Sequence, residues 1–172
     1  MDFYIARIMR RLFAPQHRLS CSCLLWYRLL RSLRQSGRNG TRESGAFLLG
    51  VKEGNSYRVK AFLLYDEVDP GSLMSGIVRL DGKFFGALWQ FCGEHELSVV
   101  ADVHTHPGSP EQSPSDRDNP IISRAGHIAL ILPNFAMGFI PRRDIGIYEY
   151  QGAKTWKSIA NVQRRSFFHI GF

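Results

Sequence analysis

Apolar residues recur along the chain with two different periods, and these periods predict both helices and strands. Leucines three to five positions apart, with arginines on the other side, predict a helix over residues 20–35 that Ser20 caps. A second helix is predicted over residues 81–96, where aromatic residues, leucine and cysteine form an apolar face. The rest of the pattern is made of shorter apolar runs.

These shorter runs are rich in β-branched residues and predict strands. They lie near residues 44–50, 56–65, 98–106, 127–132 and 145–150, with a closing strand at 155–159. Gly54 and Asn55 predict a hairpin turn between the first two strands. These strands, together with the two predicted helices, predict an α/β sandwich that has a mixed central β-sheet flanked by helices.

Composition limits the classes of protein that the chain can represent. Its 172 residues, 44% of them hydrophobic, are enough for one domain with a normal core. Three cysteines without a framework spacing argue against a disulfide-rich secreted protein, and we expect Cys21, Cys23 and Cys92 to be packing residues. No signal peptide or membrane-spanning run is apparent, so a cytoplasmic location is expected.

The basic charge is concentrated near the start of the sequence. The net charge is +7, and from Arg7 to Arg42 there are arginines but no acidic residue. We interpret this region as a solvated basic helix face, with a nucleic-acid-binding patch as the alternative. Residues 1–14 are amphipathic and basic, and we expect a frayed or docked terminal arm, with binding to a partner or a membrane surface as the alternative.

The stretch with the most chemical information runs from Val99 to Asp116. His104 and His106 are two positions apart at the end of a predicted strand, so both imidazoles lie on one face. Pro107 ends the strand, and the polar loop after it can bring a further ligand back, for which Asp116 is the best candidate. Two imidazoles and one carboxylate, with a fourth position open, are typical of catalytic zinc.

Two overlapping Ser-x-x-Asp patterns follow the histidines: Ser113 with Asp116, and Ser115 with Asp118. Capping rules favour the first, because Ser113 can cap a short helix that Pro114 begins, with the Asp116 carboxylate near its N-terminus. The simpler alternative is that both aspartates are ordinary caps in a polar loop. For His127, a hydrogen bond at the end of the sheet is favoured over a role as a ligand.

A carboxylate, Glu43, stands just before the first predicted strand. Glu43, then His-Thr-His-Pro, then Ser-x-x-Asp resembles the signature of the JAMM (MPN-plus) zinc metalloproteases, which remove ubiquitin and its relatives. The resemblance covers roughly residues 41–160 and implies the cytidine-deaminase-like sandwich of that family. It also implies that His104, His106 and Asp116 hold Zn²⁺, while Glu43 serves as the acid/base and Ser113 steadies the oxyanion. The alternative for Glu43 is a surface pair with Arg42.

The resemblance also carries expectations about organisation and function. Residues 1–40 are interpreted as a basic arm and helix, 41–160 as the peptidase core, and 161–172 as a tail without a clear period. The motif is most similar to bacterial members that accompany ubiquitin-like conjugation machinery, some of it in antiviral defence. This implies a deubiquitinase-like (iso)peptidase that cleaves after the C-terminus of a ubiquitin-like protein, for maturation or deconjugation.

The partners implied are that ubiquitin-like protein, its conjugates and conjugation enzymes of the same operon. Two alternatives remain within the family: a peptidase that acts on the tail of a sulfur-carrier protein, and a non-catalytic scaffold. A third, nucleic-acid binding through the arginine-rich first 40 residues, would give an affinity that falls steeply with salt.

Overall fold

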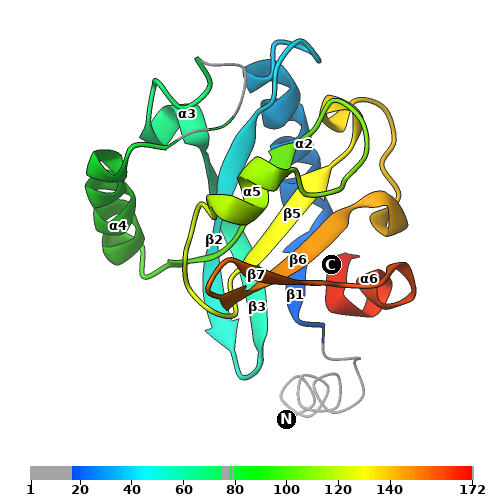
Figure 1. The fold of residues 1–172 in the computed structure, drawn as a ribbon. Coiled ribbons are helices and arrows are strands. Elements are labelled where there is room, and N and C mark those ends of the chain that lie inside the picture. Colours follow the sequence, from blue (N-terminus) through cyan, green and yellow to red (C-terminus); the bar gives the residue numbers. More distant parts are fainter. Residues whose placement is uncertain (1–16, 75–77, 79, 172) are drawn as a thin grey trace.

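The computed structural model describes residues 17–74, 78 and 80–171, and Figure 1 shows their arrangement. Its centre is a mixed eight-stranded sheet in the order β7-β6-β5-β4-β2-β3-β1-β8. The predicted arm at residues 1–14 lies outside the described residues. The α/β architecture with a mixed central sheet is therefore confirmed.

The elements follow each other along the chain with short connections. The strands are β1 (Leu19–Ser22), β2 (Gly45–Glu53), β3 (Ser56–Leu64), β4 (Ser98–Thr105), β5 (Ile128–Leu132), β6 (Gly146–Gly152), β7 (Thr155–Ser158) and β8 (Phe168–Gly171). The helices are α2 (Cys23–Ser36), α3 (Tyr65–Val68), α4 (Phe85–Glu94), α5 (Pro114–Asp118) and α6 (Asn161–Phe167), with short 3₁₀ turns at Gly82–Phe84, Asn134–Ala136 and Arg142–Asp144.

Helices cover both faces of the sheet, and β2 shows how the sequence divides its side chains between them. Ala46 and Leu48 belong to the core cluster that α2 closes. Phe47 and Leu49 point the other way, into the cluster formed with α3 and α4. This alternation is the period of two expected of a strand buried on both faces. α5 lies over the same face as α4 (Figure 1).

The N-cap of the first helix lies two residues later than predicted. Ser22 is the N-cap, and its side chain accepts a hydrogen bond from the Leu25 N–H at 3.2 Å. Ser20 was predicted as the cap, which is wrong, because it lies in β1 and its hydroxyl donates to the Tyr57 carbonyl. β1 runs parallel to both β3 and β8.

Other predicted elements agree to within a few residues, apart from two differences. The Gly54-Asn55 hairpin turn is confirmed by the pairing of Glu53 with Ser56. The predicted helix over 81–96 is divided into a 3₁₀ turn and α4. Residues 161–171, for which no element was predicted, form α6 and β8. The division of the chain into arm, core and tail stays a prediction.

The cysteines do not all have the predicted role. Cys21 and Cys92 are buried packing residues, whereas Cys23 is exposed, so the prediction is wrong for Cys23. All three are free thiols. Among the described residues no helix has the length and apolar character needed to cross a membrane.

Candidate metal centre

Two histidines lie at the end of β4, in the middle of the sheet. His104 is within the strand and His106 directly follows it, and both side chains are buried. The His106 N–H donates to the Leu132 carbonyl of β5, which extends the pairing past the end of the strand. The two imidazoles therefore share one face, as predicted, and their Nε2 atoms are 3.1 Å apart.

The third member, Asp116, is positioned by the start of α5. Ser113 is the N-cap: its hydroxyl accepts from the Asp116 N–H at 3.2 Å, and its own N–H donates to Asp116 Oδ2 at 2.7 Å. This reciprocal pair, with Pro114 as the first helical residue, is the helix start predicted from sequence. It turns the carboxylate toward the histidines, whereas Asp118 ends the helix outside the group.

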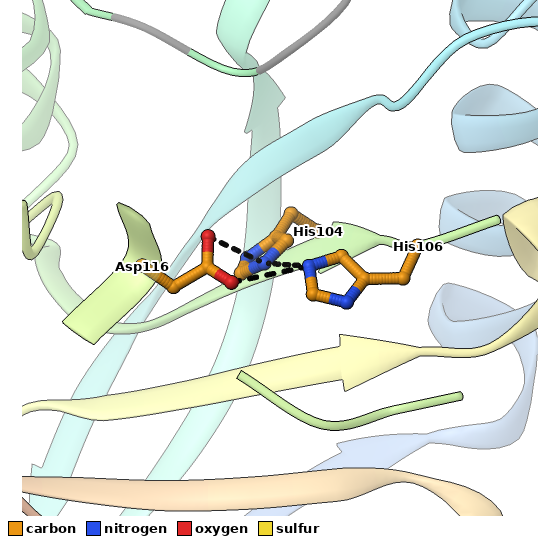
Figure 2. A group of neighbouring side chains, drawn as sticks. All are labelled: His104, His106 and Asp116. Carbon is orange, nitrogen blue, oxygen red and sulfur yellow. Dashed lines mark hydrogen bonds and ion pairs between the residues drawn. The ribbon is translucent and has the colours of Figure 1, made fainter. Parts of the chain in front are cut away.

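The three side chains converge on one point (Figure 2). Asp116 Oδ1 is 3.5 Å from His104 Nε2, and Asp116 Oδ2 is 3.2 Å from His106 Nε2. A tetrahedral zinc site with bonds of about 2.0–2.1 Å has ligand atoms about 3.3–3.4 Å apart. The spacing and the donor types therefore fit three ligands of a zinc ion, with a fourth position left open.

His104 and Asp116 stabilise each other's charged forms. Burial would raise the pKa of Asp116, but hydrogen bonds with His104 and His106 hold it well below its usual range. Burial would lower the pKa of His104, but the neighbouring carboxylates of Asp102 and Asp116 raise it to about 9. In the metal-free protein His104 is therefore protonated below this pKa. Its positive charge balances the Asp102 and Asp116 carboxylates, as a metal cation would.

Glu43 lies beside this group but outside it. Burial raises the pKa of the Glu43 carboxyl, while the charges of His106 and His104 lower it and that of Asp116 raises it. Glu43 is therefore within electrostatic range of all three side chains. A backbone contact accounts for this position. The N–H of Ser44, the residue after Glu43, donates to Thr105 Oγ1 at 3.0 Å and so holds Glu43 near the end of β4. The alternative pairing with Arg42 is not seen, since Arg42 contacts Asp66 and the Ser36 carbonyl.

Ser113 has a second capacity besides capping. Its oxygen accepts the Asp116 N–H, and a hydroxyl can also donate one hydrogen bond of its own. A cavity of about 490 Å³ adjoins the group, and His104 and Asp116 form part of its lining. Apolar side chains, among them Phe85, Ile121 and Trp156, line other parts of it. The cavity therefore opens directly onto two of the three candidate metal ligands.

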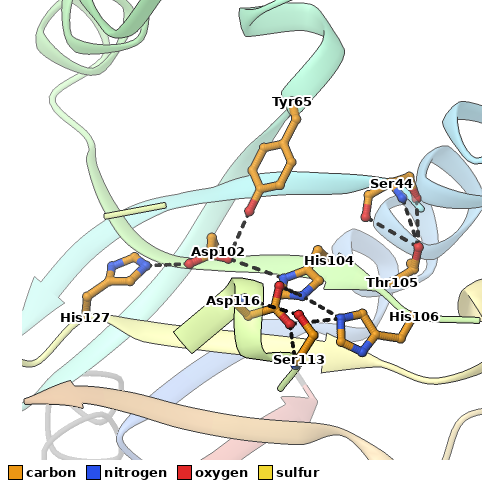
Figure 3. Close-up of polar contacts among 9 residues, drawn as sticks. All are labelled: Ser44, Tyr65, Asp102, His104, Thr105, His106, Ser113, Asp116 and His127. Carbon is orange, nitrogen blue, oxygen red and sulfur yellow. Dashed lines mark hydrogen bonds and ion pairs between the residues drawn. The ribbon is translucent and has the colours of Figure 1, made fainter. Parts of the chain in front are cut away.

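Sequence reasoning missed a buried polar cluster behind His104. Asp102 accepts hydrogen bonds from the Tyr65 hydroxyl at 2.9 Å and from His127 Nε2 at 2.5 Å (Figure 3). Burial would raise the pKa of Asp102, but the nearby His104 and the hydrogen bond with His127 lower it to about 2. The predicted hydrogen bond of His127 at the sheet end is confirmed. A signal was present in the sequence: an aspartate inside an otherwise apolar strand, two residues before a histidine.

Comparison with known proteins gives one family and a fold. A family model described as prokaryotic homologs of the JAB domain matches residues 28–143. The solution structure of protein DSY2949 from Desulfitobacterium hafniense is similar, with a TM-score of 0.62 and 14% sequence identity. That match covers 83% of this chain and 90% of the other. At this identity the likeness extends to the fold alone.

Proposed function

Because the chain belongs to the prokaryotic JAB family, as the match over residues 28–143 shows, we propose that it is a zinc-dependent peptidase acting after the C-terminus of a ubiquitin-like protein. Family membership agrees with the resemblance found in the sequence. The family includes peptidases as well as non-catalytic members, so the choice between them depends on the site.

One observation carries the proposal: His104, His106 and Asp116 converge with zinc-like spacing, and Glu43 lies beside them without joining them. A non-catalytic scaffold does not require buried histidines that face a carboxylate. Burying such polar groups lowers the free energy of unfolding unless they are fully paired. A hydrolase needs both the metal ligands and a separate acid/base. The arrangement therefore favours the catalytic members of the family.

The residues divide the chemistry among them. Bound zinc would supply a Lewis acid that makes water a nucleophile near neutral pH and polarises the substrate carbonyl. In this proposal Glu43 takes the proton of the attacking water and passes it to the departing amine. The Ser113 hydroxyl donates to the oxygen that becomes negative during attack. His104, His106 and Asp116 serve as ligands.

The substrate class follows from the resemblance, and the cavity is compatible with it. An extended chain end can enter a cavity that runs from the metal group to apolar side chains such as Phe85 and Trp156. We propose maturation or deconjugation of a ubiquitin-like protein, with conjugation enzymes of the same operon as further partners and antiviral defence as the setting. The same chemistry on a sulfur-carrier tail is the second candidate.

The experiment that tests the function incubates the zinc-loaded protein with linear fusions of the ubiquitin-like proteins encoded near its gene. We expect intact-mass spectra to show cleavage after the last residue of the modifier, and a chelator to abolish it. The matched control is the His104→Ala variant with the same fusions. Cleavage of sulfur-carrier fusions alone would favour the second candidate. No cleavage of any fusion by a zinc-loaded protein would make it a non-catalytic member.

We also expect zinc uptake to release a proton below pH 9. In the metal-free protein His104 is protonated up to its pKa of about 9. Its Nε2 must be free of a proton to bind zinc, so apparent affinity should rise up to tenfold per pH unit and level off above that pKa. Titration calorimetry in buffers of different ionisation enthalpy measures this directly. Uptake of zinc at pH 7 without proton release would contradict it.

A further inference from the structure

Three polar side chains from three elements meet behind His104, on the side away from the other ligands. Asp102 comes from β4, Tyr65 begins α3, and His127 immediately precedes β5. Their exposed fractions are 2%, 0% and 2%, so the cluster is almost wholly buried, and only Asp102 forms part of the cavity lining. None of these three residues belongs to the metal group, and none is Glu43. Burying a carboxylate costs free energy unless it is paired, so the role of Asp102 has to be explained separately from the metal ligands.

The geometry connects this cluster with one ring nitrogen of His104. Asp102 and His104 are two residues apart on β4, so both side chains lie on the same face of the sheet. Asp102 Oδ2 is 3.9 Å from His104 Nδ1, whereas His104 Nε2 faces Asp116 at 3.5 Å (Figure 3). Each nitrogen of the ring thus faces a different carboxylate, one on the buried side and one at the metal group.

This placement selects a tautomer of the imidazole. A neutral histidine carries its proton on one nitrogen, and the negative Asp102 favours the proton on Nδ1. The Nε2 lone pair is then directed at the position between His106 and Asp116, where a metal ion would bind. Both oxygens of Asp102 are held, one by the Tyr65 hydroxyl and one by His127, so the carboxylate cannot rotate freely away from the ring.

Tyr65 reaches Asp102 only because β2 has a glycine where its ring lies. Gly45 pairs directly with His104 across the β2–β4 ladder. A Cβ at Gly45 would lie 2.2 Å from Tyr65 Cε2 and 2.5 Å from Cδ2, closer than any real contact allows. The aromatic ring therefore lies over Gly45, and its hydroxyl comes to the Asp102 carboxylate behind His104.

We propose that Asp102, clamped by Tyr65 and His127, is a positioning residue that orients His104 and fixes its tautomer for metal binding. The inference rests on the proposed function, because it requires a metal at His104 Nε2. Outer hydrogen-bond partners of metal-binding histidines typically contribute about 10–100-fold to metal affinity. The Asp102 cluster should therefore be measurable in zinc affinity without any substrate.

The test compares zinc affinity between variants of the full chain by competition with a chromophoric chelator. Asp102→Asn should bind zinc about 10–100-fold more weakly, because the ring loses its negative neighbour while the volume of the side chain is kept. Tyr65→Phe, which deletes one hydroxyl, should weaken binding in the same direction by a smaller factor. It also serves as the second variant if Asp102→Asn fails to fold.

Thr105→Val is the matched control. Thr105 is buried in the same strand, next to His104, but its hydroxyl bonds to Ser44 on the opposite face. We expect this change to lower the melting temperature of the metal-free protein and to leave zinc affinity unchanged. A merely structural role for Asp102 would give the same result as this control.

A spectroscopic readout separates orientation from stability. In zinc-loaded, ¹⁵N-labelled protein, NMR should detect the His104 Nδ1 proton as a slowly exchanging signal, and Asp102→Asn should shift it and speed its exchange. Wild-type zinc affinity in both Asp102→Asn and Tyr65→Phe would overturn the inference. If the unaltered protein binds zinc with the expected contrast between variants but hydrolyses nothing, only the proposed function fails. A protein without zinc affinity would overturn both.

Discussion

Replacing Glu43 by glutamine should leave zinc content near normal and reduce hydrolysis by about 10²–10⁴-fold, the usual effect of removing a general acid/base. Glu43 lies beside the metal group without joining it, so the ligands remain when it changes. The same carboxylate is proposed to accept one proton and deliver it again, so we expect the upper end of this range. Rates on a cleavable fusion, with metal analysis of the same sample, provide the measurement.

Glu53→Gln is the matched control for this change. Glu53 is the last residue of β2, the strand that begins just after Glu43, and it pairs with Arg58 near the surface. Such a pair contributes at most about 1 kcal/mol to stability, so the control should hydrolyse at the normal rate. An active Glu43→Gln, or one that has lost its zinc, would remove Glu43 from the proposed role.

Replacing His104 by alanine should abolish zinc binding and, with it, all zinc-dependent hydrolysis. The purified wild-type chain is expected to hold about one zinc, since three ligands and an open position define one site. His104 supplies one of only three protein donors, and its loss leaves two that cannot close the coordination polyhedron. Metal analysis after dialysis gives the stoichiometry, and circular dichroism checks that the variant is folded.

The two aspartates of α5 provide an internal comparison for the same site. Asp116→Ala should lose zinc as His104→Ala does, because its carboxylate faces both histidines. Asp118→Ala should keep zinc, since Asp118 is the last residue of α5 and lies outside the metal group. Zinc retained in Asp116→Ala but lost in Asp118→Ala would show that the wrong aspartate was chosen.

Local patterns were enough to predict the strands that carry the site and the residues that meet there. The His-Thr-His spacing and the Ser113 cap are properties of single segments, so they can be recognised without knowing the fold. The structure brings His104, His106 and Asp116 together and places Glu43 next to them. Their catalytic roles stay predictions until the variants are measured.

What the sequence could not predict depends on segments that meet only in the folded chain. The Asp102 cluster requires α3, β4 and the residue before β5 to come together, and no spacing along the chain encodes this. β1 and β8 are too short to have a recognisable period, and each becomes a strand through pairing with a partner remote in sequence. Ser20 was misplaced for the same reason.

The pairing of β1 with β8 sets the order in which the protein can be completed during synthesis. β1 emerges early from the ribosome, yet one of its edges stays bare until Phe168–Gly171 arrive to pair with Leu19–Ser22. An unpaired strand edge can recruit other chains, and late closure of distant segments is slow. We therefore expect nascent chains to be more prone to aggregation until Phe168–Gly171 have left the tunnel. A protein shortened by these residues should inherit that tendency permanently.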